Sequence, residues 1–129
     1  MPIHASGENY LEAIHILGQQ KEYVRSIDLA NYLGFSKPTI SIAVHTLERN
    51  GFIEITSEGH LLLTDSGMQI ARTIYERHQV LTQLLTAIGV PEKIAMEDAC
   101  KLEHDISDTS FIKIKQIWEN HLSTPSSQL

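Results

Sequence analysis

The chain has 129 residues, with 10 Lys or Arg against 16 Asp or Glu, and therefore a formal net charge of −6. This length allows one continuous core, or two small units that share one, and it excludes two large independent domains. The negative charge argues against strong general attraction to DNA phosphates, unless basic groups gather locally or bound cations neutralise some of the carboxylates.

Neither a membrane segment nor a secretory signal is predicted. No apolar run reaches about 18 residues, and the first residues, MPIHASGENY, lack both the basic and the apolar region of a signal peptide. We therefore expect a soluble, cytoplasmic protein with no membrane partner. Cys100 is the single cysteine, so no disulfide can form within the chain.

Two helices are predicted near the N-terminus. Ser6 can cap a helix over residues 7–19, in which apolar residues recur with helical spacing. Ser26 can cap a second, short helix, and Gly34 supplies the left-handed residue that ends it. Because a new helix cap follows almost at once, the second helix is expected to lead into a tight turn.

The third helix begins at the Ser36 cap, carries Pro38 in its first turn and ends at Gly51. Two short helices joined by a tight turn are typical of a helix-turn-helix. Residues 52–56 and 60–64 are then two short β-prone runs separated by a turn, which predicts a hairpin. The N-terminal half is thus predicted to be a winged helix-turn-helix.

The outer face of the third helix is the expected DNA-binding element. In such motifs the N-terminal part of the second helix enters the major groove, where hydroxyl and basic groups bind phosphates or bases and apolar groups contact thymine methyls. Ser36 as a plain helix cap and Ile42 as an ordinary exposed apolar residue are the alternatives. The candidate DNA contacts are Ser36, Lys37, Pro38, Thr39, Ser41, Ile42 and His45.

Three more helices are predicted in the C-terminal half. Each begins at a capping residue or a proline, and the first is long enough to connect two units. They span residues 68–88 (capped by Thr64, Asp65 or Ser66 and ended by Gly89), residues 92–106 (after Pro91) and residues 109–121 (capped by Ser107 with Asp108).

The fold class expected from these elements is mainly α with a small β-hairpin. Residues 1–70 form the winged helix-turn-helix, residues 71–122 a helical metal-binding and dimerisation domain, and residues 123–129 a polar tail. Apolar residues on the last two helices are expected to form a two-fold interface. These are Ile94, Leu102, Ile106, Phe111, Ile114, Ile117 and Trp118.

Cys100, Glu103 and His104 stand at positions i, i+3 and i+4 of one predicted helix and so share a face. Mixed sulfur, oxygen and nitrogen ligands suit Fe(II), Co(II), Ni(II) or Zn(II), whereas Ca²⁺ and Mg²⁺ prefer oxygen alone. In the alternative interpretation, Cys100 is a small packing residue and the other two form a surface pair. His78 and the first-helix residues Glu8, Asn9 and Glu12 are further candidates if the helices pack together.

Three segments, EDACKLEHDIS, ERHQVLTQLL and ENYLEAIH, carry a resemblance to a known family. From Ser6 to about His121 the chain resembles the metal-activated repressors typified by the diphtheria toxin repressor and the manganese transport regulator. The resemblance implies a divalent corepressor, most simply Fe(II) and next Mn(II), in a homodimer that binds a pseudopalindromic operator and controls metal-homeostasis genes. The ligands it implies are Cys100, Glu103, His104, His78, Asn9 and, as in the manganese branch, Glu12.

Several positions depart from the iron branch of that family. Asn9 stands where the iron branch usually has Met, and Thr82 and Met96 stand where it has Glu and His. The long C-terminal extension of iron-branch members is also missing. The resemblance therefore implies a hybrid, with two domains as in the manganese branch and a cysteine-containing site as in the iron branch.

Two other functions fit parts of the pattern. A winged-helix regulator that responds to an organic ligand, or to oxidation of Cys100, needs no metal. A small metalloenzyme would use a thiolate, a carboxylate and an imidazole around a metal to activate water. We expect no enzyme, because the sequence offers no general acid or base beyond the ligands and no GxSxG, HExxH or phosphate-loop motif.

Overall fold

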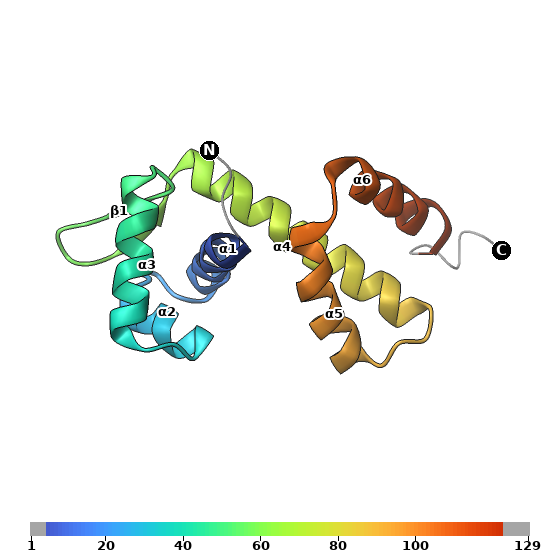
Figure 1. Cartoon of the computed structure of the whole chain (residues 1–129), viewed down its shortest axis with the longest axis horizontal. Helices are drawn as coiled ribbons and strands as arrows, with labels where there is room; N and C mark the ends of the chain where they lie inside the picture. The colour runs from blue at the N-terminus through green and yellow to red at the C-terminus, as the bar shows by residue number, and fades with distance from the viewer. Residues whose placement is uncertain (1–4, 123–129) are drawn as a thin grey trace. The chain divides into compact units, whose positions relative to one another are not determined.

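The computed structural model describes residues 5–122, so the expected polar tail, residues 123–129, lies outside the described part (Figure 1). The predicted fold class, mainly α with a small hairpin, is confirmed. The chain divides between Thr73 and Ile74 into two compact units. The elements are α1 (Ala5–Gln20), α2 (Ser26–Leu33), α3 (Lys37–Arg49), β1 (Ile53–Ile55), β2 (Leu61–Leu63), α4 (Asp65–Ala87), α5 (Glu92–Asp105), α6 (Asp108–Ile117) and a π-helical turn (Trp118–Leu122).

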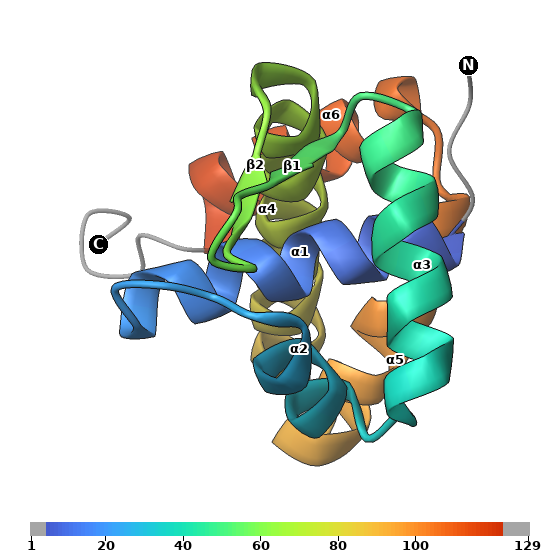
Figure 2. The same ribbon diagram turned by 90° about the vertical axis from the view of Figure 1, so that its left-hand side faces the viewer.

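The N-terminal unit is a winged helix-turn-helix, as predicted. Figure 2 shows α1 crossing behind α3, with α2 at the lower left of α3 and the hairpin to the left of the other end of α3. Gly34 ends α2 with φ of 73°, a left-handed conformation that glycine adopts without strain. Ser36 caps α3 by accepting a hydrogen bond from the Thr39 N–H at 3.3 Å. The buried side chains of the core include Leu11, Leu29, Ile40, Val44, Leu47 and Ile53.

The predicted cap of α2 was wrong by one residue. Arg25 is the N-cap, with extended backbone, and Ser26 is already the first residue of the helix. The carboxylate of Asp28 accepts a hydrogen bond from the Arg25 N–H at 2.9 Å. A side chain inside the first turn therefore satisfies the open end of this helix, which a serine cap would otherwise do from outside.

The residues just before α2, Val24 and Arg25, hold the wing, which is the hairpin of β1 and β2. β1 and β2 pair antiparallel, and the Leu61 N–H donates to the Val24 carbonyl at 2.7 Å, so the segment lines the free edge of β2. The guanidinium of Arg25 donates to the Glu58 carbonyl at 2.9 Å, at the tip of the hairpin. Arg25 is therefore a positioning residue for the wing, a role that its place in the sequence does not indicate.

Thr64 is the cap of α4 among the three predicted candidates. Its hydroxyl accepts from the Gly67 N–H at 3.2 Å and donates to the Gly51 carbonyl at 2.7 Å. A Cβ on Gly67 would lie only 2.0 Å from the Phe52 carbonyl oxygen, so glycine is required there. The first turn of α4 is thus packed directly against the chain that leads into the wing.

The C-terminal unit consists of the second half of α4 with α5, α6 and the π-helical turn. Its buried apolar residues include Ile74, Leu81, Ala95 and Phe111. The single helix predicted over 109–121 is wrong at its end, because α6 stops at Ile117. Apolar spacing does not distinguish an α-turn from a π-turn, which is why the sequence did not signal the change. Within residues 5–122, no helix combines the length and hydropathy that a membrane span requires.

Candidate metal centre

The triplet predicted from the sequence comes together on α5. Cys100, Glu103 and His104 each direct one ligand atom, a sulfur, a carboxylate oxygen and a ring nitrogen, to within 4.8 Å of the others. Cys100 is exposed, His104 is half-buried and Glu103 is fully buried. The helical spacing thus produces a compact donor group with one side open to solvent.

Glu103 is the unusual member, because a carboxylate with none of its surface exposed is costly unless it is compensated. Its Oε2 lies 2.9 Å from Nδ1 of His78. Its Oε1 is buried and has no hydrogen-bond partner among the described residues; His104 Nε2 lies 3.4 Å away. One oxygen of the buried carboxylate is therefore held by a hydrogen bond, while the other has only the ring nitrogen of His104 at 3.4 Å.

His78 joins the triplet from α4. A carboxylate only accepts hydrogen bonds, so the Nδ1–H of His78 donates to Glu103, and in that tautomer Nε2 carries the lone pair of the ring. This is the arrangement in which a histidine and a carboxylate orient each other at metal sites. The structure thus brings together four of the six predicted ligands.

Asn9 and Glu12 lie in the other unit. They are three residues apart on α1, so they share a face, and Glu12 is only 9% exposed. Their part in a metal site stays a prediction, as does that of Glu8.

Arg77 is a structural residue beside the candidate ligands that the sequence did not indicate. Its guanidinium donates to the carbonyls of Glu103 at 3.1 Å and Ile106 at 2.8 Å, pairs with the carboxylate of Asp108, and lies over the ring of Phe111 at 5.5 Å from its centroid. It thereby ties the ligand-bearing end of α5 and the start of α6 to α4. Its spacing in the sequence could have indicated that it is buried, since Arg77 falls on the buried stripe between Ile74 and Leu81.

The donor set fits a divalent transition metal. Thiolate, imidazole and carboxylate together match the preferences of Fe(II), Co(II), Ni(II) and Zn(II). The buried oxygen of Glu103 without a hydrogen-bond partner is the position where a cation would supply the missing charge compensation. No ion is needed to explain Cys100 or His104 by themselves, so Glu103 carries the case for a metal.

The predicted DNA-binding face of α3 lies on the outside of the N-terminal unit, and its contact with DNA stays a prediction. All seven candidate residues between Ser36 and His45 are exposed, whereas Ile40, Val44 and Leu47 are buried. The hydroxyls of Ser36 and Thr39 lie 2.8 Å apart and bond to each other. In this structure the two hydroxyl groups therefore stabilise the N-terminus of α3.

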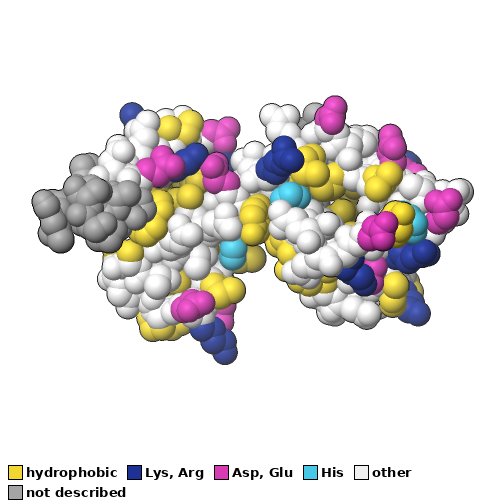
Figure 3. Space-filling view, turned by 180° about the vertical axis from the view of Figure 1, so that it is seen from behind, with side chains coloured by type: hydrophobic (Ala, Val, Ile, Leu, Met, Phe, Trp, Pro, Cys, Tyr) yellow, Lys and Arg dark blue, Asp and Glu magenta, His cyan; other side chains and the backbone are white. Residues whose placement is uncertain are grey.

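Charge is mixed over the face of the molecule in Figure 3. Lys and Arg side chains lie among Asp and Glu side chains and form no single basic patch on that face. This agrees with the net charge of −6. On that face, no cluster of basic groups offers a general attraction to DNA phosphates.

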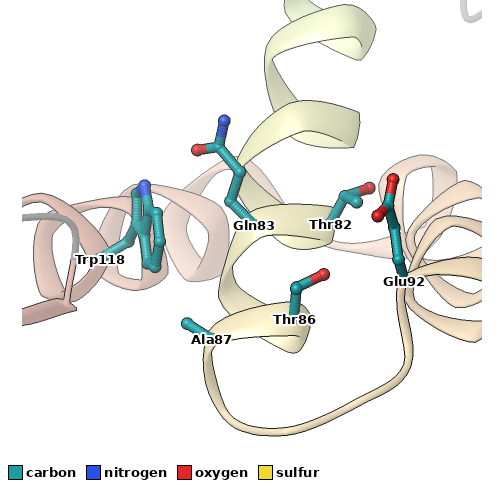
Figure 4. Close-up of a pocket in the computed structure, with 6 residues that line it drawn as sticks. All are labelled: Thr82, Gln83, Thr86, Ala87, Glu92 and Trp118. Atoms are coloured by element: carbon teal, nitrogen blue, oxygen red, sulfur yellow. The ribbon is translucent and has the colours of Figure 1, made fainter.

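The predicted dimer residues differ in their exposure. Ile94 and Leu102 are exposed at 48% and 44%, Ile114 and Trp118 are half-buried, and Phe111 is only 5% exposed beneath Arg77. Figure 4 shows Trp118 on one side of the end of α4 and Glu92 on the other. Together with Thr82, Gln83, Thr86 and Ala87 they line an open hollow of about 390 Å³.

Two family models match the chain, one in each half. The model described as iron dependent repressor, N-terminal DNA binding domain, matches residues 3–61. The model described as iron dependent repressor, metal binding and dimerisation domain, matches residues 64–128. The first range contains α1 to α3 and β1, and the second contains the donor cluster.

Curated relatives agree with the family models. The chain is 31% identical over 114 residues to the transcriptional regulator MntR of Escherichia coli O6:H1, covering 88% of this chain and 74% of the relative. It is also 31% identical over 109 residues to the HTH-type transcriptional regulator MntR of Bacillus subtilis strain 168, covering 84% and 77%.

Solved structures share the fold. A manganese-dependent transcriptional repressor in complex with manganese is 28% identical, with a TM-score of 0.77 over 85% of this chain and 51% of its own. The manganese regulator SloR, 23% identical with a TM-score of 0.78, covers 92% of this chain and 55% of its own and shows the fold alone. The chain therefore spans about half the length of these solved structures.

Proposed function

The chain belongs to the family of iron-dependent repressors, and we propose that it is a DNA-binding transcriptional repressor that a divalent transition metal activates as corepressor. The observation that carries the proposal is the buried Glu103 carboxylate, held by His78 on one oxygen and without a hydrogen-bond partner on the other, beside Cys100 and His104. Such a site gains its compensating charge when a cation binds. The proposed DNA-binding unit is residues 1–70, and the proposed metal-binding and dimerisation unit is residues 71–122.

Within this proposal, Fe(II) is the first candidate metal and Mn(II) the second. The thiol of Cys100 favours metals that accept sulfur, and Mn(II) is the weakest binder of the first-row series at such a site. One of the similar solved structures is a manganese-dependent transcriptional repressor in complex with manganese, which keeps Mn(II) in consideration. Metal availability in the cell also decides which ion is used.

The ligands divide between the two halves of the chain. Cys100, Glu103, His104 and His78 would hold the ion from α5 and α4, and Asn9 or Glu12 would complete its shell from α1. When bound, the metal supplies positive charge and directional ligand bonds. Because α1 belongs to the DNA-binding half, a ligand from α1 would make metal affinity depend on how the two halves are arranged, and by linkage the metal would favour one arrangement.

A homodimer would present two recognition helices. The exposed apolar side chains Ile94 and Leu102, with half-buried Ile114 and Trp118, support an interface on the C-terminal unit, with Phe111 backing it from within. Two helices related by a two-fold axis would bind half-sites one turn of DNA apart in a pseudopalindromic operator. A protein that binds chromosomal DNA in this way would work in the cytoplasm.

The test is operator binding as a function of metal. Duplexes are selected from a random pool by the full-length protein with Mn(II), and anaerobically with Fe(II), and the affinity is then measured with each metal and with chelator. We expect binding to tighten by at least about tenfold with metal, a coupling of about 1.4 kcal/mol. Equal affinity with every metal and with chelator would refute metal activation.

A further inference from the structure

The ring of His45 is held in one tautomer on the outer face of α3. Its Nδ1 lies 2.7 Å from the carbonyl oxygen of Ser41. Since a carbonyl only accepts hydrogen bonds, Nδ1 carries the proton, and Nε2 of the neutral ring is an acceptor. In the major groove, an acceptor of this kind pairs with an exocyclic amino group, N6 of adenine or N4 of cytosine.

Ile42 lies beside His45 on the same face, because residues three apart in a helix are neighbours. Its side chain is 70% exposed, the highest value among the large exposed apolar side chains of the described residues. An apolar group in the major groove contacts the 5-methyl group of thymine. Three residues of helix rise about 4.5 Å, so the two side chains are close enough to contact base pairs near each other in a major groove.

We propose that Ile42 and His45 form a two-residue base code, in which Ile42 selects thymine by its methyl group and His45 selects an adenine or cytosine amino group in an adjacent pair. This inference rests on the proposed function, since it names the DNA sequence that the repressor would prefer. Two further polar side chains at the start of α3, Ser36 and Thr39, hydrogen-bond to each other through their hydroxyl groups, and Ser36 caps the helix. Because these hydroxyl groups are already hydrogen-bonded, they are less available than Ile42 and His45 to contact the edges of bases.

The thymine half of the code is tested with the selected duplexes. Each thymine is replaced in turn by deoxyuridine, which removes one methyl group and leaves base pairing intact. Loss of one buried methyl corresponds to about a fourfold weaker affinity, and to about fifteenfold when both half-sites of a palindrome are changed. We expect one thymine position in each half-site to show this loss with the wild-type protein.

The assignment to Ile42 needs a matched pair of variants. Ile42→Ala is expected to bind thymine and uracil duplexes equally at that position, while Ile27→Ala, which shortens another exposed isoleucine of the same unit on α2, keeps the full difference. Thermal unfolding checks that both variants fold. Wild-type affinity insensitive to uracil at every position, or full sensitivity in Ile42→Ala, would overturn the thymine assignment.

The amino-group half is tested by repeating the selection with His45→Ala. We expect the adenine or cytosine preference next to the critical thymine to disappear, with a loss of about fivefold in affinity per half-site, and about 25-fold for a palindrome that both protomers bind, as for one hydrogen bond in each half-site. An unchanged preference in His45→Ala would refute the role of His45. These outcomes are separate from metal activation, because a site selected equally well with chelator refutes the corepressor and leaves the base code intact.

Discussion

Among single residues, Cys100 decides which metals the proposed site favours. It is the most exposed member of the donor cluster and its only sulfur ligand. Replacing sulfur with a hydroxyl keeps the size of the side chain but removes the ligand type that Co(II) and Zn(II) prefer over Mn(II). The choice of metal therefore depends more on Cys100 than on Glu103, whose oxygen ligand suits all of these ions.

We predict that Cys100→Ser lowers the affinity for Co(II) and Zn(II) by at least about tenfold, since even substitutions outside the ligand set cost that much at metal sites. The affinity for Mn(II) should fall less. Competition titrations measure both, and loss of the sulfur-to-Co(II) absorption band reports the same bond directly. Met96→Leu removes an exposed sulfur from the same helix and is the control. No loss for any metal would place Cys100 outside the site, and an equal loss for all metals would show that it does not decide the choice of metal.

At the level of elements, Arg77 holds the ligand-bearing end of α5 and the start of α6. It is 7% exposed and satisfies two carbonyls while it pairs with Asp108. Lysine would keep the charge but not the planar, forked donor, so at least one buried carbonyl would lose its hydrogen bond. The helix end that presents Glu103 and His104 would then be less well fixed.

Arg77→Lys is therefore expected to lower the free energy of unfolding by about 2–4 kcal/mol, as for other broken buried networks. Denaturant unfolding measures this value. Arg72→Lys, an exposed arginine on the same helix, should change it by less than about 0.5 kcal/mol. Similar effects of the two substitutions would show that Arg77 does not anchor α5.

The N-terminus of α2 should contribute a pH-dependent part of the stability. Hydrogen bonds from Lys21 and then from the Arg25 N–H lower the pKa of Asp28 below its ordinary value of 3.8. A lowered pKa means that the contribution is complete above the unfolded value and is lost as the pH falls through the folded one. The helix that precedes the recognition helix is thus weakened by acid.

Asp28→Asn removes that charge. At neutral pH we expect a loss of about 0.5–1 kcal/mol, the usual worth of a helix-capping group, and a flatter decline in stability below about pH 4 than in the wild type. Unfolding measured across the acid range tests both expectations, with Asp65→Asn in the first turn of α4 as the control. Parallel curves for Asp28→Asn and wild type would contradict the assignment.

The elements that local signals specify were predicted well from the sequence. Gly34, Ser36 and the apolar stripe of α3 lie where the pattern placed them, and Cys100, Glu103 and His104 converge because one helix carries all three. What was missed depends on partners far away in the chain. Arg25 and Arg77 serve backbone carbonyls 33 and 26 residues further on, which no local period reveals.

For the whole molecule, net charge and metal binding both affect the electrostatic repulsion between the protein and DNA phosphates. At −6 the chain repels phosphates over distances of about a Debye length, and each divalent ion bound without proton release would reduce that charge by two. Carboxylates gathered at a metal site would thus be least harmful to DNA binding when the site is filled. The acidic composition is compatible with a DNA-binding protein whose active form is the metal-bound one.

Metal binding should also stabilise the entire fold, because the unfolded chain does not hold the ligands together. At a metal concentration about 100 times Kd, ligand binding to the native state alone adds about 2.7 kcal/mol, which for a protein of this size corresponds to a rise in Tm on the order of 10 °C. Calorimetry with Mn(II) or Co(II) tests this. Mg²⁺ at the same concentration supplies the same ionic strength but is a poor partner for thiolate and imidazole, so it should raise Tm far less. Glu103→Ala should abolish the difference between the metals. Equal shifts with Mg²⁺ and Co(II), or a full Co(II) shift in that variant, would show that the ion stabilises the chain from somewhere other than the α5 cluster.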